Sequence, residues 1–329
     1  MACVKKVSLR VFFCLFLSLN LFTQAPALDK KVSSALSHYI MAVMYDKLGD
    51  FDKAIQEYKK AIKLDPGSPL IHLNLAASFI KANKTDEAIA ELNVAVTLTP
   101  ESPEPHAILA LLYSLQNKAG LATAEYEIAL KNASKLQPKN IDIYKSLGLI
   151  YLQQKKFEAA QDVYRNILEL SPQDAEAHFY LGNIYYELDK KAEAEREIKK
   201  ALSMKPDYAD ALNFLGYFYL EENKNFSIAE KMIRKALEME PNNGAFVDSL
   251  GWLYFKQGKF ASAIAELERA AKLMNDPVIY LHLGEVYYAS GNKEKARLNW
   301  EESLKLDPAQ DTLKSKLEEM EQIKTNAKR

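Results

Sequence analysis

A repeat of 34 residues fills most of this 329-residue chain and restricts its possible folds more than any other feature. Four segments that close on proline show the repeat: MAVMYDKLGDFDKAIQEYKKAIKLDP, LAASFIKANKTDEAIAELNVAVTLTP, LGLIYLQQKKFEAAQDVYRNILELSP and LGNIYYELDKKAEAEREIKKALSMKP. An apolar, a small and an aromatic residue recur in the front half, and alanines around a bulky apolar residue recur in the back half. A fixed period of this length indicates stacked units of supersecondary structure.

Each repeat predicts two amphipathic helices, because its apolar residues recur three and four positions apart and a small residue lets the two helices approach. One pair cannot bury its apolar face alone, so neighbouring pairs must stack. We therefore expect an all-α chain that forms one elongated, right-handed α-solenoid. Proline ends a helix because it cannot continue the hydrogen-bond ladder. The prolines that should end the second helices are Pro66, Pro100, Pro172, Pro206, Pro241 and Pro308.

The repeat resembles the tetratricopeptide repeat, whose units join a Trp-x2-Leu-Gly-x2-Tyr element, Ala-x3-Phe and a closing proline. Five repeats carry Leu-Gly-x-x-Tyr, at Leu147-Gly148-Tyr151, Leu181-Gly182-Tyr185, Leu215-Gly216-Tyr219, Leu250-Gly251-Tyr254 and Leu283-Gly284-Tyr287. The first three carry Met41-Ala42-Tyr45, Leu75-Ala76-Phe79 and Leu109-Ala110-Tyr113. The resemblance implies about eight helix-turn-helix units and a C-terminal capping helix. The last two repeats resemble those of many bacterial envelope proteins, so an exported bacterial-type member is expected.

The predicted domain organisation follows the register of the repeat. It comprises a signal peptide at 1–27, a short lead at 28–34, a solenoid at 35–310, and a capping helix with a frayed tail at 311–329. The eight repeats are 35–68, 69–102, 103–140, 141–174, 175–208, 209–243, 244–276 and 277–310. The third is about four residues too long, near KNASKLQPKN. That excess is either tolerated loop variation or a break between the third and fourth repeats.

The N-terminus reads as a secretory signal peptide. Lys5, Lys6 and Arg10 precede an apolar run at 11–22, and small residues up to Ala27 follow. This pattern predicts cleavage after Ala27. The alternative is a retained anchor, but the run is shorter than the roughly 20 residues that span a bilayer. We expect an exported, periplasmic or secreted protein whose mature chain has no membrane span.

Composition and motifs exclude several function classes. A net charge of −1 argues against a nucleic-acid partner, which requires clustered positive charge. Cys3 and Cys14 both lie within the predicted signal, which leaves the mature chain without a disulfide or a cysteine-based metal site. Motifs for phosphate binding, dinucleotide binding, serine hydrolysis and zinc proteolysis are missing from the sequence. We therefore expect no enzyme activity, no cofactor and no metal.

Histidines and carboxylates recur in the register of the repeat. Four histidines occupy the fourth position, where the family has Trp, and this predicts packing residues: His38, His72, His106 and His178. His282 falls two residues later in its repeat and is expected on the inner surface. Four carboxylates occupy the second position, where they either favour the helix start or form an acidic row in a groove: Glu104, Asp142, Glu176 and Asp210. The start of the first helix is expected to be capped by Ser33 or Ser34.

The resemblance implies a groove lined by the second, fifth, sixth, ninth, twelfth and thirteenth positions of each repeat. In the last four repeats these positions are rich in aromatic and polar residues, the residue types that dominate binding hot spots. The predicted peptide-binding residues are Phe179, Tyr180, Asn183, Tyr186, Asn213, Phe214, Tyr217, Asp248, Trp252, Phe255, His282, Glu285 and Tyr288. The alternative is that neighbouring repeats bury these aromatics.

The predicted function is a non-catalytic scaffold of the cell envelope that binds an extended segment of another protein, such as a secretion or assembly component. The alternative is a helper of a glycosyl- or peptidoglycan-acting envelope enzyme carried on another chain. Some family members bind chaperone tails through a carboxylate clamp of Lys at the fifth and Asn at the ninth position. In the fourth repeat, Lys145 at the fifth position is combined with Leu149 at the ninth. In the fifth repeat, Asn183 at the ninth position is combined with Phe179 at the fifth. The clamp is therefore incomplete, and binding of chaperone tails is not expected.

Overall fold

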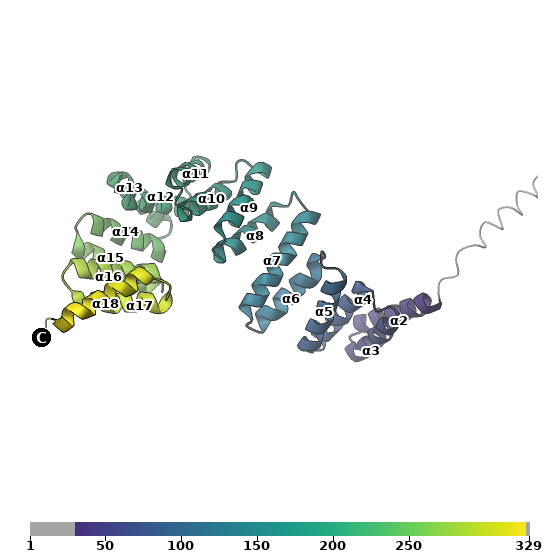
Figure 1. The fold of residues 1–329 in the computed structure, drawn as a ribbon. Coiled ribbons are helices and arrows are strands. Elements are labelled where there is room, and N and C mark those ends of the chain that lie inside the picture. Colours follow the sequence, from purple (N-terminus) through teal and green to yellow (C-terminus); the bar gives the residue numbers. More distant parts are fainter. Residues whose placement is uncertain (1–29, 327–329) are drawn as a thin grey trace, which may run out of the picture. The chain divides into compact units, whose positions relative to one another are not determined.

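The computed structural model describes residues 30–326, which form seventeen α-helices (Figure 1). The predicted signal peptide, 1–27, and the last three residues lie outside this range. Eight helix pairs followed by a final helix confirm the predicted all-α solenoid with its cap. Within residues 30–326, every helix is too short or too polar to traverse a bilayer.

The helices alternate between a first and a second member of each pair. The first helices are α2 (Lys30–Lys47), α4 (Pro69–Lys81), α6 (Pro103–Leu115), α8 (Ile141–Gln153), α10 (Ala175–Glu187), α12 (Ala209–Glu221), α14 (Gly244–Lys256) and α16 (Pro277–Ala289). The second helices are α3 (Phe51–Leu64), α5 (Thr85–Leu98), α7 (Ala119–Leu136), α9 (Phe157–Leu170), α11 (Lys191–Met204), α13 (Phe226–Met239), α15 (Phe260–Leu273) and α17 (Lys293–Leu306). The final helix is α18 (Asp311–Asn326).

The prolines act on the second helices through the residue that precedes them. Helix α9 ends at Leu170, and its C-cap residue Ser171 has φ −140° and ψ 82° before Pro172. Proline disfavours the helical conformation of its predecessor, so the helix ends there. At the start of the chain, α2 contains both Ser33 and Ser34 in its interior, so the expected serine cap is wrong.

The turn inside every pair contains one residue with positive φ at the same position of the repeat. Left-handed backbone favours Gly and, next, Asn or Asp, and these types fill all but one of the eight places. The residues are Gly49, Asn83, Asn117, Lys155, Asp189, Asn223, Gly258 and Gly291. The sixth turn, one residue longer, contains a second left-handed residue, Asn225.

The extra length of the third repeat is helical. Helix α7 has 18 residues, whereas α5 and α9 have 14 each, so the predicted loop variation is instead one additional turn of helix. Contacts between residues divide the chain into two compact parts, Met1–Ile143 and Tyr144–Arg329, with the boundary inside α8. We call these the N-terminal array and the C-terminal array. The boundary lies close to the break considered between the third and fourth repeats.

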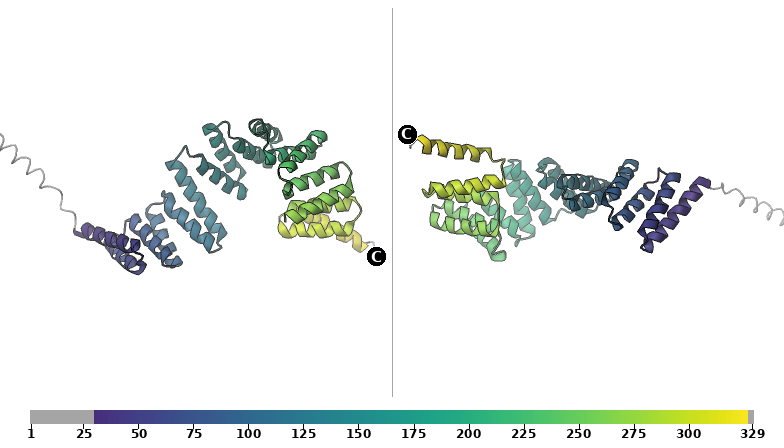
Figure 2. Two further views of the ribbon diagram at one scale, coloured as in Figure 1. Left: turned by 180° about the vertical axis from the view of Figure 1, so that it is seen from behind. Right: turned by 90° about the horizontal axis from the view of Figure 1, so that it is seen from below.

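Each array has its own core between the paired helices. In the N-terminal array, Leu75, Leu92 and Leu109 are fully buried. In the C-terminal array, Gly182 allows a close approach of α10 to α11, because a Cβ there would lie 2.6 Å from Ile198 Cδ1. Helix α18 closes the C-terminal array beside the last pair, where Leu313 is buried (Figure 2).

Candidate binding face

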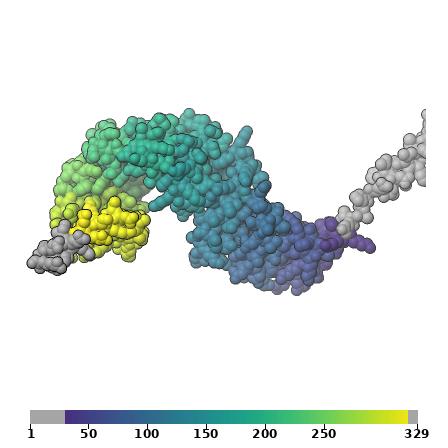
Figure 3. All heavy atoms as spheres, in the orientation of Figure 1, coloured from purple at the N-terminus to yellow at the C-terminus, as the bar shows by residue number. Residues whose placement is uncertain are grey.

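Three first helices of the C-terminal array, α12, α14 and α16, contact one another in sequence order. Helix α14 lies between the other two, and nine of its thirteen residues are buried. The space-filling view shows the C-terminal array, coloured from teal to yellow, as a curved body (Figure 3). The predicted binding residues of this array fall into a buried group and a partly exposed group.

The buried group forms one polar and aromatic network. His282 Nδ1 lies 2.9 Å from both carboxylate oxygens of Asp248, and its ring stacks on Trp252 with 4.0 Å between centroids. Trp252 Nε1 donates to Glu221 Oε1 at 2.7 Å, and the Tyr217 hydroxyl lies 3.5 Å from His282 Nε2. The network ties α12, α14 and α16 together.

Burial limits what this network can contact. Asp248, Trp252 and His282 expose only 6%, 9% and 4% of their surface. Burial also raises the pKa of the Tyr217 phenol. Asp248, Trp252 and His282 contact one another inside the array, whereas Tyr217 keeps part of its surface exposed.

The partly exposed group contains a chain of aromatic contacts between α10 and α12. Phe214 packs edge-on against Tyr186 with 5.5 Å between centroids and against Phe179 at 6.4 Å. The Tyr180 ring extends this chain, with its centroid 5.1 Å from that of Tyr164 and 5.4 Å from that of Phe179. All of these rings except Tyr164 keep part of their surface exposed. They offer contiguous aromatic surface with phenol groups at its edge.

Polar residues lie beside these rings. Asn183 donates to the Phe179 carbonyl of its own helix at 2.9 Å. Asn213 Oδ1 is buried without a hydrogen-bond partner among the described residues. An unpaired buried acceptor carries a desolvation cost.

The far end of the face meets the capping helix. Phe255 is half-buried against Trp252, with 4.8 Å between ring centroids, and Tyr288 is exposed on α16. Lys316 of α18 donates to Glu285 Oε1 at 2.5 Å, and its ammonium lies 5.8 Å from the Tyr288 ring centroid. The capping helix therefore contributes positive charge next to the last predicted residues.

We define the C-terminal aromatic face by the predicted residues that keep exposed surface. They are Phe179, Tyr180, Asn183, Tyr186, Asn213, Phe214, Tyr217, Phe255, Glu285 and Tyr288. Their role in peptide binding stays a prediction.

The carboxylates of the second position have different surroundings. Lys145 lies 2.6 Å from Glu176 and 3.0 Å from Asp174, so Glu176 belongs to an ion pair. Burial, followed by repulsion from Glu240, raises the pKa of Asp210. Glu176 is paired with a lysine whereas Asp210 is repelled by another carboxylate, so these two second-position residues differ in their electrostatic surroundings.

In residues 30–326, neither a metal-type grouping of side chains nor any of three surface hollows includes a predicted binding residue. In residues 30–326, no three His, Cys, Asp or Glu side chains are grouped to hold a metal ion. Three surface hollows lie elsewhere, including one on α11 lined by Glu195, Arg196 and Lys199. None of these three is lined by a predicted binding residue.

Two sequence profiles, both described as tetratricopeptide repeat, match the chain. One matches residues 47–112 and 151–216, and the other matches residues 109–175, 219–277 and 249–311. Together they cover residues 47–216 and 219–311, which span helices α3 to α17. The chain belongs to the tetratricopeptide repeat family. No curated protein matches its sequence.

Several solved structures share the fold. A tetratricopeptide repeat protein from Parabacteroides merdae ATCC 43184 is 22% identical with a TM-score of 0.59, over 76% of this chain and 97% of that one. A chain of the APC/C hetero-tetramer Cut9-Hcn1 is 18% identical with a TM-score of 0.56, over 82% of this chain and 52% of that one. Yeast Tom70 is 20% identical with a TM-score of 0.50, over 93% and 66%.

The tetratricopeptide repeats of this chain contain a recurring histidine–glutamate contact that the sequence analysis missed. Each fourth-position histidine contacts a glutamate 19 residues later on the second helix of its own repeat. The Nδ1 to Oε2 distances are 2.6 Å for His38–Glu57, His72–Glu91 and His106–Glu125, and 2.7 Å for His178–Glu197. The recurring 19-residue spacing was the available signal.

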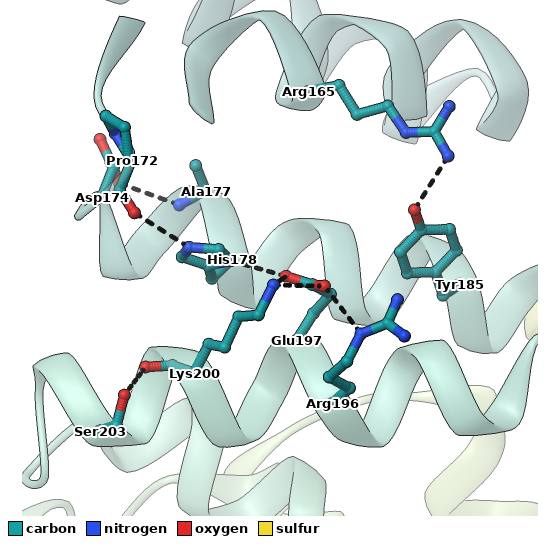
Figure 4. Close-up of polar contacts among 10 residues, drawn as sticks. All are labelled: Arg165, Pro172, Asp174, Ala177, His178, Tyr185, Arg196, Glu197, Lys200 and Ser203. Carbon is teal, nitrogen blue, oxygen red and sulfur yellow. Dashed lines mark hydrogen bonds and ion pairs between the residues drawn. The ribbon is translucent and has the colours of Figure 1, made fainter. Parts of the chain in front are cut away.

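The second ring nitrogen joins neighbouring tetratricopeptide repeats. His178 Nε2 lies 3.2 Å from the carbonyl oxygen of Pro172, the closing proline of the preceding repeat (Figure 4). His72 and His106 make the same contact to Pro66 and Pro100. These three histidines are buried, in agreement with the predicted packing role.

The glutamate of the pair is held in its charged form. Burial of Glu197 opposes ionisation, but hydrogen bonds from Lys200 and His178 outweigh it, so its pKa lies below the ordinary 4.5. Hydrogen bonds from Lys60 and then His38 lower the pKa of Glu57 in the same way. The histidine of each pair occupies the fourth position, where the family has Trp, and packs the two helices of the repeat through its contact with the glutamate.

Proposed function

We propose that this protein is a non-catalytic scaffold that binds an extended segment of another protein on the C-terminal aromatic face. Tetratricopeptide repeat proteins mediate protein–protein interactions. The observation that carries the finer proposal is the contiguous, partly exposed surface of Phe179, Tyr180, Tyr186 and Phe214. Large rings with a polar edge bind extended chains at low entropic cost.

The place of action that we propose is the cell envelope. The support is the N-terminal sequence, where the basic residues, the apolar run and Ala27 follow the pattern of an exported protein. Partners would then be envelope, secretion or assembly components. Detection of the protein in a cytosolic fraction alone, with its N-terminal residues intact, would overturn this part.

The binding test uses capture followed by affinity measurement. Partners are captured with the protein from an envelope extract, their contact segment is mapped, and that segment is titrated as a synthetic peptide. Tyr186→Ala and Phe214→Ala are each expected to weaken binding about tenfold or more, because truncation of a hot-spot aromatic removes roughly 1.4 kcal/mol or more. Trp252 is unsuitable as a test residue because its burial couples binding to folding.

A matched control separates the face from general aromatic loss. Tyr126 is exposed on α7, outside the C-terminal aromatic face, so Tyr126→Ala should leave affinity unchanged. Equal binding by wild type and by both face variants would refute the peptide-binding face. Capture of one folded enzyme through a different surface would favour the helper alternative instead.

A further inference from the structure

Helix α2, where the described part of the N-terminal array begins, presents an apolar stripe to solvent. The stripe consists of residues spaced four apart along α2, which follow one ridge of the helix, and of Leu48 in the turn directly after it. They are Val32, Leu36, Ile40, Met44 and Leu48, with exposed fractions of 54%, 49%, 49%, 59% and 77%. Scattered exposed apolar residues are ordinary on a protein surface, but an aligned row marks an interaction site.

The other repeats show what normally covers these positions. Ile40 and Met44 are the sixth and tenth residues of the first repeat. In the second repeat, Asn74 at the sixth position donates to the Tyr39 hydroxyl of the preceding repeat at 3.2 Å. Ser78 at the tenth position donates to Asp46 of the preceding repeat at 2.9 Å. Both positions therefore face the preceding repeat.

The same relation holds in the C-terminal array. Phe214 and Phe218, at the sixth and tenth positions of the sixth repeat, both pack against Tyr186 of the fifth. Tenth-position residues are buried in all seven later repeats: Ser78, Leu112, Ile150, Ile184, Phe218, Leu253 and Val286. The first repeat keeps the composition of a repeat-to-repeat interface, and within residues 30–326 no preceding repeat covers it.

We propose that a second copy of this chain covers the stripe, so that two α2 helices pack across a two-fold axis. Between Lys31 and Asp46 the helix has no acidic or basic residue except His38, which is engaged with Glu57. The stripe therefore selects an apolar helix face, and the same stripe on another copy provides one. A two-fold contact of this kind is closed and self-complementary.

Charge at the helix ends is compatible with this arrangement. Ridges of residues four apart interdigitate at a crossing angle near −50°. With Ile40 at the crossing point, the two helices diverge toward Lys30, Lys31 and Lys47. The like charges are thereby separated, and the apolar centre is buried.

Head-to-tail stacking is disfavoured because the other end of the chain is closed. Helix α18 covers the last pair, with Leu313 buried and Leu317 and Met320 packed against the same cluster. A second copy cannot add its α2 to that cluster unless α18 leaves. The association is therefore expected to stop at a dimer.

Sedimentation equilibrium of the full chain, in the form that the expressing cell yields, tests the proposal. Wild type is expected to be a concentration-dependent dimer. The double variant Ile40→Glu, Met44→Glu should raise the dimer dissociation constant about 100-fold or more, because it places four carboxylates in the contact. Leu298→Glu, at an equally exposed leucine of α17, should leave it within about twofold.

Cysteine cross-linking gives an independent readout. With Cys3 and Cys14 changed to Ser, Ile40→Cys should form a disulfide-linked dimer on mild oxidation, whereas Leu298→Cys should not. A wild type that stays monomeric, a dimer that survives the double variant, or equal cross-linking at both positions would overturn the proposal. Monomeric protein that binds vesicles of phosphatidylethanolamine and phosphatidylglycerol through α2 would also overturn it.

Discussion

At the scale of single residues, the array depends on positions where a side chain has no room. Gly284 lets α16 approach α17 so closely that a Cβ would overlap the indole of Trp300, which is fully buried. Gly120, near the start of α7, has nothing within 4 Å of the equivalent position. Both glycines lie in helices, so a comparison of alanine substitutions at the two positions separates the effect of packing from that of helix propensity.

Gly284→Ala is expected to lower the free energy of unfolding by about 1–3 kcal/mol, because the added methyl group overpacks the core. Gly120→Ala should instead raise stability by up to about 1 kcal/mol, since alanine is the better helix former. Urea unfolding followed by circular dichroism measures both. Effects of the same sign would contradict the close-packing explanation.

Lys155 is the one residue among the eight left-handed turn positions that is neither glycine, asparagine nor aspartate, with φ 55°. A left-handed conformation costs a residue with a Cβ roughly 1–2 kcal/mol. Lys155→Gly is therefore expected to stabilise the protein by up to about 1 kcal/mol, after the entropic cost of glycine. Gln173→Gly, at an exposed loop position without positive φ, should not stabilise. Thermal unfolding distinguishes the two variants.

At the scale of helices, the histidine–glutamate pairs join the two helices of a repeat and the closing proline of the preceding one. His178 and Glu197 form the most enclosed of these pairs, with side-chain exposures of 7% and 5%. His38 at the chain's first repeat lies in a more open place, with 30% side-chain exposure. We therefore expect the histidine–glutamate pair to contribute most to stability where it is enclosed by neighbouring repeats.

Glu197→Gln is expected to lower the free energy of unfolding at pH 7 by about 1–3 kcal/mol, because it removes a buried charged acceptor. The pKa of Glu197 is lowered in the folded state, so its contribution is present above pH 4.5 and is lost as the pH falls through the folded value. The difference from wild type should therefore shrink below pH 4.5.

Stability measured against pH for wild type and variant checks this expectation. Glu169→Gln, at an exposed position of α9, provides the control and should follow wild type at every pH. A Glu197→Gln difference that stays constant down to pH 3 would show that the carboxylate charge does not stabilise the pair.

At the scale of the whole molecule, stacked repeats require closed ends, because each repeat is stabilised by its neighbours. Helix α18 fulfils this at the C-terminus, where Leu313 packs with Trp300 and Tyr287. At the other end, α2 keeps its apolar stripe exposed within a single chain. The two ends of the molecule therefore differ in what they can bind.

A chain that stops at Gln310 is expected to lose about 2–4 kcal/mol or more of stability in the last repeats, because the burial of Leu313 and its neighbours is lost. Hydrogen exchange of α16 and α17 amides should accelerate, while amides of the N-terminal array should not change. A chain that stops at Asn326 is the control. Unchanged exchange in α16 and α17 would show that α18 is dispensable.

Local chemistry made much of the fold predictable from sequence. The helix pairs follow from apolar spacing, and the ends of the second helices follow from prolines such as Pro172, because each effect acts within a few residues of the chain. The four extra residues of the third repeat were harder to place. The extra residues could lengthen either a helix or a loop, and in the structure they add one turn to α7.

Burial was decided by tertiary structure. Tyr288 and Trp252 both occupy predicted groove positions, yet Tyr288 is exposed whereas Trp252 stacks on His282 of the next repeat. The sequence alone determined the repeat, its helices and its turns, since these depend on near neighbours. Only tertiary packing decided which aromatic rings stay accessible, because their burial depends on the next repeat. It also brought each fourth-position histidine to a glutamate, because that contact joins the two helices of one repeat.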